Sequence, residues 1–141
     1  MHPGVEVFYP ALALVLLTLI VSLRMYKDRV GWFRKNRVNP QRASTRAERD
    51  WPAEIQKSSD NFQNLLELPM LFYFATVVLY VTQTVDTTAL VLAWLYVAHR
   101  YVHSFIHCTY NKVIQRFYVY AVSGLILFAL WGKIGFDLLT A

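Results

Sequence analysis

The stretch from Asn61 to Thr82, NFQNLLELPMLFYFATVVLYVT, is long and apolar enough to cross a membrane, yet it contains the charged residue Glu67. The hydrocarbon core of a bilayer is about 30 Å thick and takes about 20 mostly apolar residues to cross as a helix. A charged side chain inside it costs roughly 2.5–3.5 kcal/mol on insertion scales, so it usually faces a partner or a wet cavity. The stretch therefore predicts both a membrane span and a site near its start.

Similar apolar runs lie on both sides of this stretch. The 141 residues are 56% hydrophobic and 16% aromatic, which favours an integral membrane protein over a soluble domain. The later connections are short, which favours antiparallel packing of neighbouring helices. We predict an all-α, integral membrane, antiparallel four-helix bundle that forms one domain over residues 1–141. The predicted spans are Val5 to Leu23, Asn61 to Thr82, Thr87 to Ile106 and Phe117 to Leu139.

Positive charge is concentrated between the first two spans. Residues 24–59 hold ten of the fourteen Lys and Arg against four acidic residues, a net charge of +6. Basic connections stay in the cytoplasm, so this loop is predicted to be cytoplasmic and both termini non-cytoplasmic. Such a loop also favours contact with anionic membrane lipids. We expect no nucleic acid partner, since no nucleic-acid-binding motif accompanies the charge.

Two polar stripes run along the second and third predicted spans. The helical spacing of 3.6 residues places each set on one face of its helix. Glu67 and Arg100 each lie seven residues from the expected cytoplasmic ends, Asp60 and His107, which is about 10 Å along a helix. The sequence therefore predicts an ion pair between Glu67 and Arg100. The stripes consist of Asp60, Gln63, Asn64 and Glu67 on the second span, and His99, Arg100, His103 and His107 on the third.

The same depth argument pairs Asn64 with His103. Pro69 removes a backbone donor and predicts a bend that frees carbonyl groups near Leu65 and Leu66. Two interpretations of the buried network stay open: it fixes helix register, or it faces a ligand. We expect no metal site, because no carboxylate–histidine motif or cysteine cluster accompanies the histidines.

The motifs on these two spans resemble the MAPEG family, the membrane-associated proteins of eicosanoid and glutathione metabolism. Its second helix carries an Asn-x-x-Glu signature followed closely by proline, here Asn64 to Glu67 with Pro69. Its third helix carries arginine followed by tyrosine, here Arg100-Tyr101. The number of spans, the basic first loop and the chain length agree as well.

This resemblance implies a homotrimer that holds glutathione between subunits and receives a lipophilic small-molecule substrate from the bilayer. The expected function is that of a glutathione-dependent transferase or peroxidase acting on lipophilic electrophiles. Lys112 or Arg116 would favour the glutathione thiolate. The implied glutathione-binding residues are Arg24, Asn64, Glu67, Arg100, Tyr101 and His103, and the implied catalytic residues are Arg116, Lys112 and Tyr101.

An alternative is a non-catalytic membrane module of the same fold, either an accessory subunit or a lipid-binding scaffold. Asp60 stands where the family often has an arginine, and Phe105 stands where a tyrosine is expected. Both departures favour this alternative.

Overall fold

The structure is a computed structural model of the chain, and it describes residues 4–37, 41 and 52–140. Within these residues the regular structure is entirely helical, which confirms the predicted fold class. The elements are η1 (Val5–Val7), α1 (Phe8–Asn36), α2 (Ala53–Asn64), α3 (Leu68–Val81), α4 (Thr87–Cys108) and α5 (Val113–Thr140).

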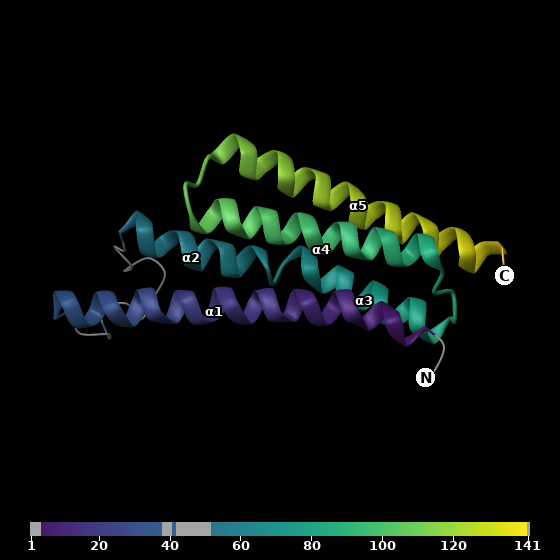
Figure 1. The fold of residues 1–141 in the computed structure, drawn as a ribbon, viewed down its shortest axis with the longest axis horizontal. Coiled ribbons are helices and arrows are strands. Elements are labelled where there is room, and N and C mark those ends of the chain that lie inside the picture. The colour runs from purple at the N-terminus through teal and green to yellow at the C-terminus, as the bar shows by residue number, and fades with distance from the viewer. Residues whose placement is uncertain (1–3, 38–40, 42–51, 141) are drawn as a thin grey trace.

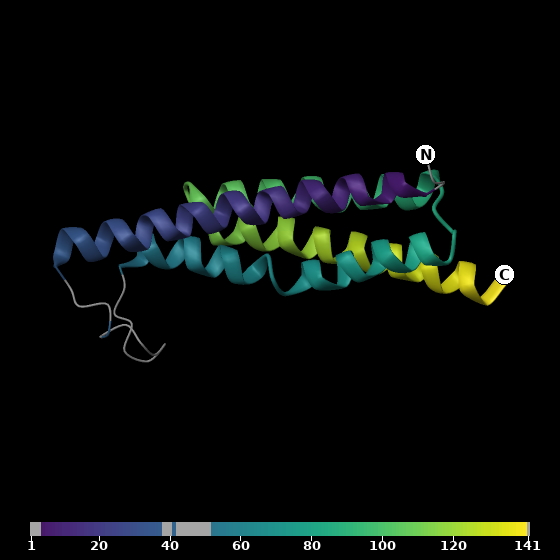
Figure 2. The same cartoon turned by 90° about the horizontal axis from the view of Figure 1, so that it is seen from below.

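The helices form an elongated four-helix bundle. Figure 1 shows α1, α4 and α5 as long rods, with α2 and α3 placed end to end as the fourth. Helix α4 packs along α5 and also contacts α1 and α2, and the view in Figure 2 agrees. The beginning of α1 and the end of α5 lie at the same end of the bundle. Rods that follow one another along the chain therefore run antiparallel, as the sequence predicts.

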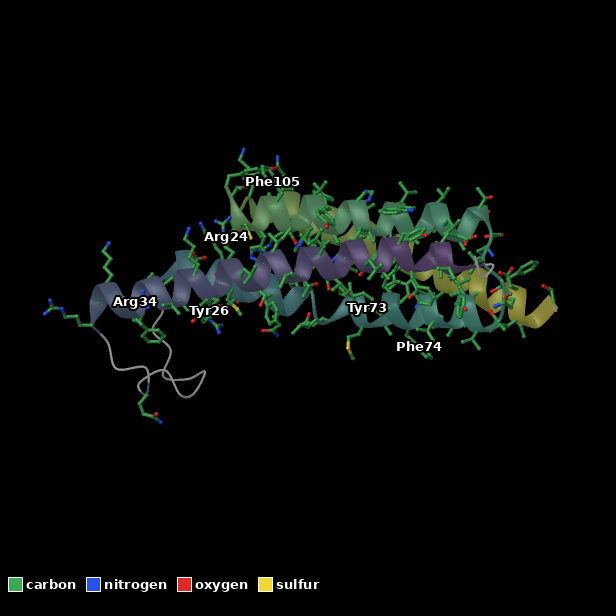
Figure 3. The ribbon with its side chains drawn as sticks, turned by 60° about the horizontal axis from the view of Figure 1, so that its bottom comes forward. Arg24, Tyr26, Arg34, Tyr73, Phe74 and Phe105 are labelled. Atoms are coloured by element: carbon green, nitrogen blue, oxygen red, sulfur yellow. The ribbon has the colours of Figure 1, made fainter. Side chains whose placement is uncertain are left out.

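The outer surface of the bundle is apolar. Leu16 on α1 is 52% exposed and Phe128 on α5 is 60% exposed, and Phe74 and Phe105 also point outward (Figure 3). Within the described residues, three helical stretches have the length and hydropathy to cross a membrane: Val5–Asn36, Ile55–Val81 and Val113–Thr140. A lipid-facing position accounts for so many exposed apolar side chains. Helix α4, the other predicted span, carries the polar stripe that contains Arg100 and is less apolar for that reason.

The second predicted span is interrupted, not merely bent. Helix α2 ends at Asn64 and α3 begins at Leu68, with Pro69 in its first turn, where a backbone N–H is not needed. Glu67 has φ −81° and ψ −89°, which is not helical. In a continuous helix the Asn64 carbonyl would accept from the amide four residues later, so the interruption frees it for another donor.

The predicted loop 24–59 is helical at both ends. Helix α1 has 29 residues, about 43 Å at the helical rise, and so extends well past a bilayer core of about 30 Å. Figure 1 shows the end of α1 and the start of α2 projecting beyond α4 and α5. Arg34 lies on this projecting part of α1, and Arg24 lies level with the end of α4 (Figure 3). The location of residues 24–59 in the cytoplasm stays a prediction.

At the opposite end of the bundle, Asp86 begins α4. Its carboxylate accepts a hydrogen bond from the Ala89 amide at 2.8 Å and lies 3.2 Å from Lys133 Nζ. Burial raises the pKa of Asp86, but the Ala89 hydrogen bond and Lys133 lower it more, so its pKa falls below the ordinary 3.8. The ionised Asp86 carboxylate therefore stabilises the native protein at pH values above its ordinary pKa of 3.8. This contribution is lost as the pH falls through the lowered pKa of the native state.

We expect Asp86→Ala to lower the free energy of unfolding by about 1 kcal/mol, the usual effect of losing an N-cap. Asp86→Asn is the control, because it keeps a capping oxygen and should lose only a few tenths of that amount, mostly from the exposed ion pair. The free energies of unfolding of both variants can be measured by unfolding the detergent-solubilised protein with a denaturing detergent at neutral pH. Equal losses in the two variants would show that the ion pair, not the cap, supplies the stability.

Candidate anionic-ligand site

Arg100 is the largest fully buried side chain of the protein's described residues, with 0% exposure. It lies on α4, and its Nη2 donates a hydrogen bond to the Asn64 carbonyl, the group freed where α2 ends. Its Cζ lies 5.3 Å from the centre of the Tyr120 ring on α5, within the range of a cation–π contact. The guanidinium is therefore held between the interrupted helix and α5.

No carboxylate of the described residues lies within ion-pair distance of Arg100, and Glu67 attracts it only from farther away. Among the described residues, ion pairs join Arg24 to Asp28 and Lys133 to both Asp86 and Asp137. The Nε and Nη1 atoms of Arg100 are buried and have no hydrogen-bond partner among those residues. A buried cation with unused donors costs free energy unless an anion or other acceptor compensates it. This arrangement is suited to binding an anionic group.

A cavity of about 210 Å³ adjoins Arg100. Two residues that contact the Arg100 guanidinium, Asn64 and Tyr120, lie in its wall. The rim reaches the surface of the bundle, because Phe117 is 64% exposed. The cavity is lined by Asn64 of α2, His103 of α4, and Val113, Arg116, Phe117 and Tyr120 of α5. No carboxylate is in this lining set, which combines one cation, Arg116, with neutral polar and apolar side chains.

Arg116 is the second cation of the site. Its Nη1 lies 2.8 Å from Nε2 of His107 and 2.9 Å from Oδ1 of Asn111. Arg116 also lines a second cavity of about 270 Å³, together with His107 and Asp60. The guanidinium thus stands between the two cavities, at the end of the bundle where α4 turns into α5.

The predicted ion pair between Glu67 and Arg100 is wrong. The structure describes both residues, and they do not pair: Oε1 of Glu67 accepts from Nε2 of Gln63 at 3.0 Å, and Glu67 is exposed. The prediction assumed a continuous helix, which would keep Glu67 on the face of Asn64. The interruption at residues 65–67 turns Glu67 away, and the Asn64 carbonyl takes its place as the partner of Arg100.

Of the other predicted site residues, some line the cavity and some lie elsewhere. Asn64, His103 and Arg116 meet in the cavity. Tyr101 lies on a different side of α4, where its hydroxyl donates to the Ala13 carbonyl of α1 at 2.7 Å. Arg24 donates to the Cys108 carbonyl at 2.8 Å and lines a separate cavity of about 400 Å³ between α1 and α2. Lys112 is exposed in the turn before α5.

Sequence reasoning missed Tyr120 and Asn61. Tyr120 lies one helical turn after Arg116, a spacing that would have placed both on one face of α5. Asn61 is 0% exposed; it accepts from the Ser104 hydroxyl at 3.2 Å, and its Nδ2 lies 3.3 Å from Cys108 Sγ. Its position three residues before Asn64 was the available signal, since that spacing extends the polar stripe.

Comparison with known proteins agrees with this architecture. The family model described as the MAPEG family matches residues 7–136, nearly the whole chain. No curated protein and no solved structure matches the chain. The match includes all four rods of the bundle and every residue of the cavity. The chain therefore belongs to the MAPEG family, the integral membrane proteins of eicosanoid and glutathione metabolism.

Proposed function

We propose that this protein binds glutathione at the cavity beside Arg100 and acts as a glutathione-dependent transferase or peroxidase on lipophilic electrophiles. The observation that carries the proposal is the buried Arg100 guanidinium, which within the described part of the chain has two donor atoms without a partner and no carboxylate in ion-pair contact. Glutathione carries two carboxylates and a thiol. Membership of the MAPEG family supports glutathione as the ligand class.

The residues that line the cavity, and Arg100, which contacts Asn64 and Tyr120 of its wall, suit different parts of glutathione. One carboxylate would take the unused donors of Arg100, because charge-assisted hydrogen bonds to a guanidinium are strong in a low-dielectric site. The Asn64 amide and the His103 ring would hydrogen-bond the peptide groups. Arg116 would lie closest to the sulfur, since it stands at the rim of the cavity beside the exposed Phe117.

The chemistry begins with the thiol. A nearby guanidinium favours thiolate over thiol, and each unit of lowered thiol pKa corresponds to about 1.4 kcal/mol. In a conjugation, the thiolate sulfur forms a bond to an electrophilic carbon and the leaving group departs with the bonding electrons. The apolar co-substrate would reach the sulfur from the lipid-facing surface of α5, where Ile114 and Phe117 are exposed.

Arg116 is a better candidate than Lys112 for the thiolate-stabilising cation, because Lys112 does not line the cavity. Arg24 and Tyr101 do not reach the cavity within one protomer. In the homotrimer that we propose on the family resemblance, glutathione lies between subunits. Arg24 would then assist from a neighbouring protomer, and Tyr101 would support the packing of α1 on α4.

Glutathione binding and thiolate formation test the proposal directly. We expect saturable binding by calorimetry, and a thiolate absorbance that appears on stopped-flow mixing at neutral pH. S-methylglutathione is the matched control ligand: it should bind without a thiolate signal because its sulfur cannot ionise. Failure of the purified protein to bind either compound would refute the proposed function.

The alternative is a non-catalytic membrane module of the same family. Asp60 and Phe105, the two departures from the family pattern, support it, and Phe105 points outward with 64% exposure. Such a module would bind glutathione without thiolate formation, or would not bind it and would co-purify with a stable protein partner. The stopped-flow measurement separates the two functions.

A further inference from the structure

Arg116 is held by two acceptors that come from outside its own helix. The two N–H groups of its Nη1 reach Nε2 of His107 on α4 and Oδ1 of Asn111 in the turn between α4 and α5. Both distances, 2.8 and 2.9 Å, are those of good hydrogen bonds. A long side chain that would otherwise sample many rotamers is thereby fixed at the cavity.

His107 can accept this hydrogen bond only as a neutral ring. It is 1% exposed, and a guanidinium always donates, so Nε2 carries the lone pair and Nδ1 carries the proton. The charged or titratable groups that face it are Arg116 of α5, Lys57 and Asp60 of α2, and His103 on its own helix. Protonation of His107 would remove the acceptor and place a second cation beside Arg116.

Asn111 is placed by the turn that ends α4. Its φ is +50°, and its amide donates to the Ile106 carbonyl at 2.9 Å, which closes the end of the helix. Glycine and asparagine adopt this left-handed conformation more readily than other residues. Asparagine also supplies Oδ1, which glycine lacks, and this atom is the one that contacts Arg116.

We propose that His107 and Asn111 are positioning residues that hold the Arg116 guanidinium against the sulfur of bound glutathione. The inference rests on the proposed function. Neither residue lines the 210 Å³ cavity; both line the second cavity, of about 270 Å³, on the other side of Arg116. Their hydrogen bonds to Nη1 let them act on the ligand through Arg116. The two residues determine how strongly the site favours the thiolate.

Substitutions can remove each acceptor with little change in the fold. Asn111→Gly keeps a residue suited to the left-handed turn and removes Oδ1, and His107→Leu removes Nε2. His107→Gln is the conservative variant, because its side-chain oxygen can accept the same hydrogen bond. His99→Leu is the control on the same helix, since His99 contacts the Leu95 carbonyl and not Arg116.

The readout is the pH titration of the thiolate absorbance of bound glutathione. We expect Asn111→Gly and His107→Leu to raise the pKa of the bound thiol by about half a unit to one unit, which lowers the thiolate population about 3- to 10-fold below that pKa. His107→Gln should restore most of the wild-type value, and His99→Leu should not change it. A wild-type thiol pKa in both Asn111→Gly and His107→Leu would overturn the inference.

A second measurement does not depend on glutathione. Nitrogen NMR of labelled histidine should show His107 as the Nδ1–H tautomer with Nε2 accepting, and Arg116→Gln should weaken the signature of that bond. An Nε2–H tautomer in the wild type would overturn the inference. If the wild-type protein forms no thiolate, the positioning role fails together with the proposed function; if it does and the variants match it, only the positioning role fails.

Discussion

Replacing Arg100 by glutamine should weaken glutathione binding by about 10- to 100-fold and leave the protein folded. Loss of one charged hydrogen-bonding partner is worth about 1.5–3 kcal/mol, and each 1.4 kcal/mol is a factor of ten in affinity. Arg100 is fully buried beside the cavity with Nε and Nη1 unused, so its charge is weakly screened by water. Calorimetric titration of the purified variant with glutathione measures the loss.

A second substitution separates ligand binding from folding. Glutamine keeps a polar donor on this face of α4, although its amide nitrogen reaches only to the position of Nε, whereas Arg100→Met has no donor and leaves the buried Asn64 carbonyl without its partner. We expect both variants to lose affinity, but only Arg100→Met to lose a further 1–3 kcal/mol, roughly, in the free energy of unfolding. Wild-type affinity in Arg100→Gln would show that Arg100 has only the structural role of joining α4 to the interrupted helix.

The overall fold could be predicted from the sequence because lipid imposes strong constraints. A backbone in hydrocarbon must satisfy its own hydrogen bonds, so apolar stretches such as Asn61 to Thr82 are restricted to helices or closed barrels. Short connections then determine which helices run antiparallel. The bundle follows from these patterns, and the family resemblance follows from the motifs at Asn64 to Glu67 and Arg100-Tyr101; both are confirmed.

The site was predictable only in part, because its geometry depends on one local interruption. Equal depth along the two helices paired Asn64 with His103, and both line the cavity, but it also paired Arg100 with Glu67, whereas the partner of Arg100 is the Asn64 carbonyl. Periodicity had treated Glu67 as part of the same face as Asn64. A proline two residues later signals a helix boundary or a bend, and the sequence alone does not distinguish a bend from a full break. The break both turned Glu67 outward and released the carbonyl that now holds Arg100.

The contacts of Arg116 illustrate a second limit. Its partners Asn111, in the turn, and His107, on the helix before the turn, lie five and nine residues earlier in the chain. Helical spacing relates residues within one helix, so it could not show that α4 and α5 close on each other in this way. For the same reason the sequence could not distinguish Lys112 from Arg116 as the thiolate-stabilising cation. The structure distinguishes them, because Lys112 is exposed in the turn.

Arg116→Gln should raise the pKa of the bound glutathione thiol by about one to two units, because an opposite charge within about 4–6 Å shifts a titrating group by about that much. The thiolate population at neutral pH, and with it the rate of conjugation to a lipophilic aryl halide, should then fall about 10- to 100-fold. Binding of S-methylglutathione should change little, since its sulfur carries no charge for Arg116 to stabilise. The pH dependence of the conjugation rate measures the thiol pKa directly.

Lys112→Gln is the matched control, because it removes one positive charge from the same turn without touching the cavity. We expect its conjugation rate and thiol pKa to equal those of the wild type. Arg116→Lys should lie between the wild type and Arg116→Gln, since lysine keeps the charge but lacks the guanidinium, whose Nη1 contacts His107 and Asn111 while its other nitrogens remain for the ligand. Loss of activity in Lys112→Gln together with full activity in Arg116→Gln would contradict this assignment. The thiolate would then lie outside the 210 Å³ cavity, near the exposed turn that carries Lys112.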